Sequence, residues 1–182
     1  MEESVRTTGC EMQEEQMNVL AQATEEERRD PVESEVAQVQ TLHDLAQYAF
    51  QTLHMPDYDV RAYSPLTLAF LGDAVYELII RTMVVTKANT NPNQLNKQSS
   101  GLVKAATQAE MMHIILEQLT DEELAVYKRG RNAHSATKAK NATVVDYRVA
   151  TGFEALMGYL YLQGKLTRII DLVQMGLDGR QK

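Results

Sequence analysis

Two apolar stretches of the sequence each contain an acidic residue that a packed helix does not favour. Asp73 lies within Leu68–Ile80, and Glu154 is the only charged residue of Val149–Leu162. A carboxylate in apolar surroundings becomes neutral, pairs with a cation, or costs several kcal/mol of folding free energy. We therefore expect a positive charge opposite Glu154.

Two kinds of partner are open for Glu154. The residues three and four positions away cannot pair with it, so an arginine from elsewhere, such as Arg131 or Arg148, is one solution. The other is a hard cation held by acids from two helices. Mg²⁺ suits that arrangement, because it takes few protein carboxylates and keeps water or phosphate oxygens as its remaining ligands.

Asp73 belongs to a predicted helix in which Asp73, Glu77 and Arg81 share one face. The apolar residues expected on the other face are Leu71, Val75, Leu78 and Ile79. A solvated face with a Glu77–Arg81 ion pair is one interpretation. Gly72 favours another, because a glycine inside a helix costs ~1 kcal/mol and indicates close approach by a second backbone or a ligand.

A positively charged segment separates the two acids along the chain. Residues 128–140 contain five cations and no acid. The cations and neighbouring amides are Lys128, Arg129, Arg131, Asn132, Lys138, Lys140 and Asn141. A solvated loop usually mixes both signs of charge, so this composition favours contact with phosphates, which would make binding salt-dependent without reading base sequence.

Helical spacing of apolar residues and helix-start signals cover the chain from residue 42 onward. Apolar spacing predicts helices over 42–53, 65–86, 104–119 and 166–173. The predicted starts are Ser64–Pro65, Asn91–Pro92, Thr120 and Thr143, and Gly164 is a predicted end. Since no region alternates with period two, we expect an all-α helical bundle.

The acidic charge is concentrated at the start of the chain. Residues 1–40 hold eleven acids and three bases, so the net charge of −7 over 182 residues leaves the other 142 residues at +1. The composition predicts a disordered acidic tail over 1–40 and one folded domain over 41–182. A short helix over 12–23 is the alternative for part of the tail.

Cysteine content and hydropathy indicate the cellular compartment in which the protein works. Cys10 is the lone cysteine, which excludes an intrachain disulfide and favours a reducing compartment. The sequence has no basic and apolar leader and no apolar window long enough to span a membrane. We expect a cytoplasmic protein that does not use a membrane.

Four motifs at matching spacing resemble one enzyme family. Phe70–Val75 resembles the signature of the ribonuclease III catalytic domain, and Phe153–Gly158 resembles its second acidic helix. The likeness is closer to the Mini-ribonuclease III subgroup, whose pattern also includes Arg129–Ala133 and Lys138–Asn141. It covers about residues 60 to 175.

The resemblance implies an all-α homodimer that hydrolyses double-stranded RNA with Mg²⁺ and leaves 5′-phosphate and 3′-hydroxyl ends. By motif position, Asp73 and Glu154 are the catalytic, metal-binding acids, supported by Gly72, Glu77 and Thr151. The implied substrate is the precursor of large-subunit ribosomal RNA. Preference for one site would come from RNA structure or from an assisting ribosomal protein.

The chain departs from the larger family members at several positions. Ala69, Leu66 and Thr151 stand where those members carry further carboxylates, so fewer metal ligands are expected. About twenty residues follow Gly164, too few for the double-stranded-RNA-binding domain of larger relatives. RNA would then be held by the catalytic dimer, through the basic segment and Arg148, and recognised by A-form shape and 2′-hydroxyls.

Two other functions fit the sequence. The first is a non-catalytic RNA-binding module on the same fold, in which the reduced acidic cluster holds no metal. The second is a helical adaptor whose acidic tail binds a basic partner, which predicts that function depends on residues 1–40.

Overall fold

Helices are the only regular secondary structure in the described part of the chain. The computed structural model describes residues 48–49, 51–54, 58–134 and 143–180. The chain divides between Pro56 and Asp57 into two units, and the helical bundle belongs to the second, Asp57–Lys182. The elements of this unit are η1 (Val60–Ala62), α4 (Pro65–Lys87), α5 (Pro92–Val103), α6 (Ala105–Ile115), η2 (Leu116–Gln118), α7 (Asp121–Asn132), α8 (Val144–Leu162) and α9 (Leu166–Gly179). Because the described ranges contain no strand, the predicted all-α class is confirmed.

Side-chain caps begin four of these helices at the predicted positions. The Ser64 and Asn91 side chains accept hydrogen bonds from backbone N–H groups three residues on, each at 3.1 Å. Thr120 and Glu123 form a complete capping box at the start of α7, and Thr143 caps α8. These bonds satisfy N–H groups that have no partner within the helix, which explains why the starts were readable from sequence.

Helix ends follow the sequence less closely. The helix expected over 104–119 ends at Ile115 and tightens into the 3₁₀ turn η2 before the extended Leu119. Gly164 follows the end of α8 with φ of 70°, as a helix-ending glycine should. The expected helix over 42–53 and the expected tail over 1–40, with Cys10 and the alternative helix over 12–23, lie wholly or mostly outside the described residues.

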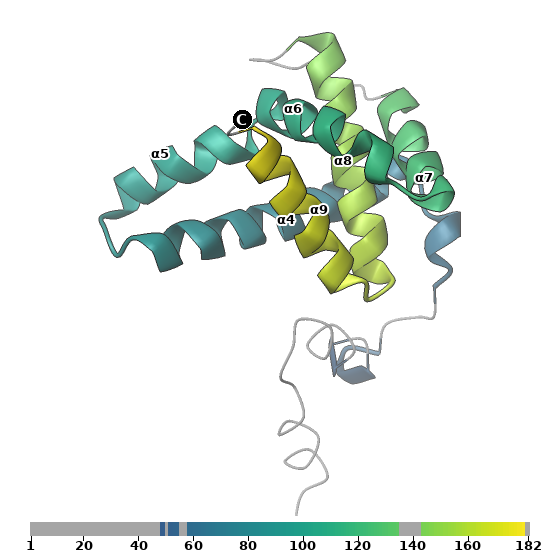
Figure 1. The fold of residues 1–182 in the computed structure, drawn as a ribbon. Helices are drawn as coiled ribbons and strands as arrows, with labels where there is room; N and C mark the ends of the chain where they lie inside the picture. Colours follow the sequence, from purple (N-terminus) through teal and green to yellow (C-terminus); the bar gives the residue numbers. More distant parts are fainter. Residues whose placement is uncertain (1–47, 50, 55–57, 135–142, 181–182) are drawn as a thin grey trace, which may run out of the picture. The chain divides into compact units, whose positions relative to one another are not determined.

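Helix α8 is the centre of the unit. It contacts α4, α6, α7 and α9, and Figure 1 shows these helices gathered around it. Every residue from Val149 to Leu160 is buried except Glu154. A helix that is apolar on all sides needs neighbours on all sides, and the edge-to-face contact of Phe153 with Tyr76, at 5.1 Å between ring centroids, is one example.

Helices α4 and α8 cross in direct backbone contact at two glycines. A Cβ atom added to Gly72 would overlap the carbonyl oxygen of Glu154 and lie 2.6 Å from the backbone nitrogen of Gly158. One added to Gly158 would overlap the carbonyl oxygen of Leu68 and lie 3.0 Å from the Gly72 nitrogen. The close approach that Gly72 predicted is therefore confirmed, and its partner is a backbone.

Helix α4 carries four large apolar side chains that are exposed. Leu66, Phe70, Leu78 and Val85 are these residues, which we call the apolar stripe, although Arg81 lies among them on the helix surface and Val85 also borders α5. Phe70 is 84% exposed. Of the apolar residues expected opposite Asp73, Val75 is buried and Leu71 and Ile79 pack against the core, but Leu78 is 49% exposed, because the core is filled from the Val75, Tyr76 and Ile80 side of the helix.

No helix in the described ranges is both long enough and apolar enough to cross a bilayer. Helices α4 and α5 are joined at one end as a hairpin (Figure 1), and they contact each other.

The glycine crossing makes a prediction about stability. Gly158→Ala should destabilise the protein by ~1–3 kcal/mol, because the added Cβ overlaps the Leu68 carbonyl and the two backbones must separate. Gly101→Ala is the matched control, since nothing lies within 4 Å of its added Cβ, and it should stabilise by ~0.5–1 kcal/mol. Urea unfolding measures both, and equal midpoints for the two variants would contradict the overlap.

Candidate active site

The glycine crossing brings the two acids into one neighbourhood. Asp73 follows Gly72 on α4, and the Gly72 backbone lies against the Glu154 carbonyl on α8. The Asp73 charge is also one of the causes that raise the pKa of the Glu154 carboxyl. The helix turns that carry the two acids therefore lie against each other at the crossing.

The environment of Glu154 strongly disfavours its charge. The pKa of the Glu154 carboxyl is raised to about 8, mainly by burial and to a smaller extent by the Asp73 charge, while the Gln108 amide acts in the opposite direction. Asp73 remains exposed to solvent, yet partial burial raises its pKa as well, with a smaller contribution from the Glu77 charge. Both carboxylates would be stabilised by a cation placed between them.

Glu77 is engaged with Arg81 rather than with the site's buried acid. The Arg81 guanidinium donates to Glu77 Oε1 at 2.6 Å, and both side chains are partly exposed. Such a surface pair contributes ~0.3–0.5 kcal/mol. The expected ion pair is confirmed, and Glu77 acts on the site through its charge near Asp73.

Neither candidate arginine pairs with Glu154. Arg131 lies over the Tyr127 ring, 5.7 Å from its centroid, and donates to the Asn132 side chain. Arg148 is exposed, and no ion pair within the described ranges includes either arginine. Among the described residues, neither arginine supplies the positive charge expected opposite Glu154.

Few side chains of the site could bind a metal ion. Among the described residues, no group of three or more His, Cys, Asp or Glu side chains could hold a metal ion. The pair Asp73 and Glu154 fits a cation that takes one or two carboxylates and retains water, which is the usual habit of Mg²⁺. It does not fit a zinc or transition-metal site built from several protein ligands.

Thr151, expected from the sequence to support the acids, is buried in α8. Its hydroxyl donates to the Tyr147 carbonyl at 2.9 Å within the same helix. Its role beside Glu154 stays a prediction.

The basic residues of α7 lie close to the same part of α8. A Cβ added to Gly130 would lie 2.7 Å from the Ala155 Cβ and 3.1 Å from the Thr151 carbonyl oxygen, so α7 packs on the turn that carries Glu154. Lys128, Arg129, Arg131 and Asn132 are exposed around this contact. Lys138, Lys140 and Asn141 lie outside the described residues.

One residue of the site was not found from the sequence. Gln108 on α6 is buried, and its amide acts to lower the pKa of Glu154, but it stands in the uncharged run Ala105–Ala109. A neutral amide at a helix position carries no signal of spacing or charge, so only the packing of α6 on α8 reveals it.

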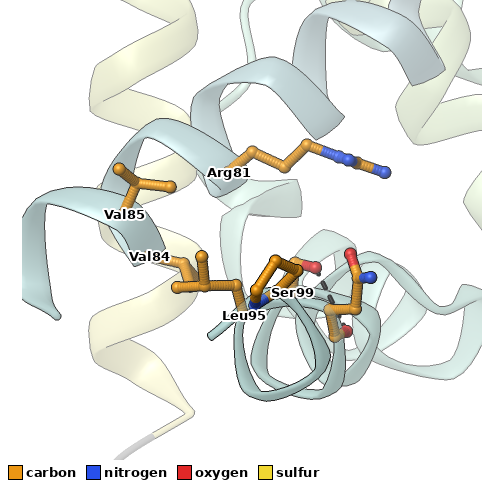
Figure 2. A pocket seen from close by; sticks show the side chains of 7 residues that line it. Arg81, Val84, Val85, Leu95 and Ser99 are labelled. Carbon is orange, nitrogen blue, oxygen red and sulfur yellow. Dashed lines mark hydrogen bonds between the residues drawn. The ribbon is translucent and has the colours of Figure 1, made fainter. Parts of the chain in front are cut away.

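A separate cavity lies between α4 and α5. Its volume is about 140 Å³, and Figure 2 shows Arg81 along one side with Val84, Val85 and Leu95 forming much of the wall. Pro92, Asn96 and Ser99 complete the lining. Since neither Asp73 nor Glu154 lines it, this cavity is not part of the acid site.

Comparison with known proteins shows related sequences and a related structure. Residues 66–165 match the model of the Ribonuclease III domain family. The chain is 50% identical over 116 residues to a Mini-ribonuclease 3 of Brevibacillus brevis, covering 64% of this chain and 87% of that protein. It is 48% identical over 117 residues to a Mini-ribonuclease 3 of Streptococcus pneumoniae, covering 63% and 91%. A crystal structure of a Fusobacterium nucleatum protein, 34% identical, aligns with a TM-score of 0.61 over 68% of this chain and 99% of that one.

The raised pKa of Glu154 makes a prediction about pH. Since its folded-state pKa of about 8 exceeds the ordinary value of 4.5, the folded protein keeps a proton that the unfolded chain releases between these values. This group therefore stabilises the metal-free protein fully below about pH 4.5, and that contribution is lost as the pH rises toward 8.

Replacing Glu154 with Gln should weaken the dependence of stability on pH. The substitution should therefore raise Tm, measured in EDTA, by more at pH 8 than at pH 5. The exposed Glu117→Gln is the control and should leave the profile unchanged. Thermal unfolding followed by circular dichroism measures both, and a Glu154→Gln profile parallel to the wild type would count against a buried acid.

Proposed function

Because the chain belongs to the ribonuclease III family, within its Mini-ribonuclease III group, we propose that it cleaves double-stranded RNA with Mg²⁺ held by Asp73 and Glu154. Membership of this group makes the chain an endoribonuclease. The observation that supports the metal assignment is the α4–α8 crossing, where the Gly72 backbone beside Asp73 lies against the Glu154 carbonyl, while no ion pair among the described residues includes either acid.

The chemistry follows from what the two acids can hold. When bound, Mg²⁺ supplies an activated water as nucleophile and offsets negative charge on the scissile phosphate. Asp73 and Glu154 orient that ion from rigid helices, and the apolar surroundings of Glu154 limit competing solvent. Hydrolysis would leave a 5′-phosphate and a 3′-hydroxyl.

The exposed basic residues support a duplex substrate. Lys128, Arg129, Arg131 and Arg148 are solvent-exposed, and α7 packs beside the turn carrying Glu154. Cations on this surface would contact the RNA backbone, with Asn132 available for 2′-hydroxyl groups. Lys138, Lys140 and Asn141 are assigned to the same surface by sequence.

The biological substrate we propose is the precursor of large-subunit ribosomal RNA, processed in the cytoplasm. Backbone contacts alone do not choose a cleavage site, so the choice would rest on RNA shape or on a ribosomal protein bound to the precursor.

The apolar stripe of α4 supports a homodimer. Phe70 is 84% exposed, one turn before Asp73, and the stripe continues through Leu78 and Val85. A self-complementary apolar helix face is suited to two-fold pairing, in which the same residues of both copies meet. Such a dimer would place two acid sites on one assembly.

The metal assignment predicts the behaviour of Asp73→Asn. This variant should cut a long RNA duplex at least about a hundredfold more slowly in Mg²⁺, because one charged ligand of the ion is lost. Duplex binding measured in Ca²⁺ or EDTA should stay within about threefold of wild type, since the basic surface is intact. Asp171→Asn on the exposed face of α9 is the matched control. Normal cutting by Asp73→Asn would show that the metal lies elsewhere.

The dimer predicts the behaviour of Phe70→Ser. Removing a large apolar side chain from both copies should weaken dimerisation at least about a hundredfold, as measured by sedimentation equilibrium. Ile170→Ser provides the comparison, because Ile170 is a 50% exposed apolar residue on α9, away from the stripe. The stripe is not the interface if both variants sediment like the wild type.

A further inference from the structure

Arg131 is an exposed cation whose guanidinium is held by two neighbours. The guanidinium carbon lies 5.7 Å from the centroid of the Tyr127 ring, one helix turn earlier on α7. The Arg131 Nε donates to Oδ1 of Asn132 at 3.3 Å. Together the ring and the amide restrict both the position and the plane of the guanidinium. Among the described residues, the two terminal nitrogens of Arg131 have no hydrogen bond or ion pair, so they can donate to a ligand.

The Tyr127 ring on which Arg131 lies belongs to the core. Its residue is 3% exposed, and it packs on α8. A Cβ atom added to Gly152 would lie 2.6 Å from Tyr127 Cδ2 and 2.7 Å from its Cε2. The edge of the ring therefore lies directly against the α8 backbone, two residues before Glu154. Arg131 thus rests on a ring that cannot move without disturbing that contact.

A pair of glycines also holds α7 against α8. A Cβ atom added to Gly130 would lie 2.9 Å from the Gly152 Cα, so the two backbones meet here without a side chain between them. Arg131 directly follows Gly130, and Glu154 comes two residues after Gly152. The backbone contact therefore fixes the place of Arg131 relative to the acidic turn of α8.

The other basic residues of this surface have no such support. Arg129 donates to the Arg61 carbonyl at 3.4 Å, and neither Lys128 nor Arg148 has a ring contact or an ion pair among the described residues. A purely structural use of Arg131 would be its favourable interaction with the C-terminal end of α7. That use needs a positive charge in the last turn, but neither a ring nor a fixed guanidinium plane, and lysine would serve it equally well.

We propose that Tyr127 is a positioning residue, which holds the Arg131 guanidinium so that its terminal nitrogens bind a phosphate of the RNA backbone at a fixed place relative to the acid pair. The inference rests on the proposed function, in which this surface holds double-stranded RNA. The planar guanidinium can donate to two phosphate oxygens at once, whereas the lysine ammonium acts as a point charge. The contact therefore depends on the guanidinium plane as well as on charge, and it fixes where the backbone is held relative to where it is cut.

The first test is binding of a long RNA duplex by the full chain, measured in Ca²⁺. Arg131→Lys keeps the charge and loses the planar guanidinium. It should weaken binding about five- to tenfold, while the slope of log affinity against log salt concentration stays that of the wild type. An equal affinity of Arg131→Lys and the wild type overturns the proposal.

Arg180→Lys is the matched control for this substitution. The Arg180 guanidinium pairs with Glu110 at 2.7 Å instead of lying on a ring. The control should bind the duplex within about twofold of wild type, because the number of positive charges is unchanged. An equal loss of affinity in Arg180→Lys and Arg131→Lys also overturns the proposal, since the loss would then not depend on the ring.

The second test asks whether Tyr127 acts through Arg131. Tyr127→Leu removes the ring and should weaken duplex binding about as much as Arg131→Lys, whereas Tyr127→Phe keeps the ring and should bind within about twofold of wild type. In an Arg131→Ala background, Tyr127→Leu should cost no further affinity. Equal losses in the two backgrounds, or equal losses for Leu and Phe, would mean that Tyr127 only supports the fold, and the proposal would be wrong. If Tyr127→Leu is unfolded at the assay temperature, Arg131→Lys decides, because it leaves the core intact.

Failure of this inference can be told apart from failure of the proposed function. If the wild type binds and cuts the duplex while Arg131→Lys binds normally, the inference alone is wrong. If the wild type binds the duplex without cutting it in Mg²⁺, the proposed activity is wrong, and the binding measurements still decide the role of Tyr127. If the wild type does not bind the duplex, both fall.

Discussion

The contact between the Gly72 and Gly158 backbones is the constraint on which the acid site depends. Helices usually pack with their axes 8–10 Å apart, separated by side chains. At this crossing the residue in contact on each helix is a glycine, which has no side chain, so the backbone of α4 lies directly against that of α8. The residue after Gly72 and the residue four before Gly158 are the two acids. This approach, closer than ordinary side-chain packing permits, is what the proposed sharing of one cation by two acids, one per helix, requires.

The burial of Glu154 makes the free energy of folding depend on the charge of its carboxyl group. All the other residues of α8 from Val149 to Leu160 are buried, and the surrounding core disfavours a charged carboxylate. A protein that needed only stability would place an apolar residue there. The acid is retained at a cost to the metal-free fold, and a bound cation would offset that cost.

Much of the fold was predictable because its signals are local. Ser64, Asn91, Thr120 and Thr143 begin helices through bonds to residues three positions on, and Gly164 ends one through its own backbone conformation. The family resemblance and the two acids were also readable, because they depend on residue type and spacing. Leu78 was grouped with Val75, which is buried, although it is exposed, since helical spacing alone does not show where an apolar face stops meeting the core. Gln108 was not singled out because its burial arises from α6 packing on α8, which no pattern within α6 encodes.

The rigidity of the crossing has a consequence for the substrate. Both acids stand on helices of 23 and 19 residues joined through their backbones, so the described part of the site has no hinge that could adjust its geometry to different ligands. Adaptation must then come from the nucleic acid, whose scissile phosphate has to be delivered to a fixed point. Duplexes that bend or widen easily at one step would be favoured over stiffer ones, so that mechanical compliance of the RNA contributes to selectivity where no base is read.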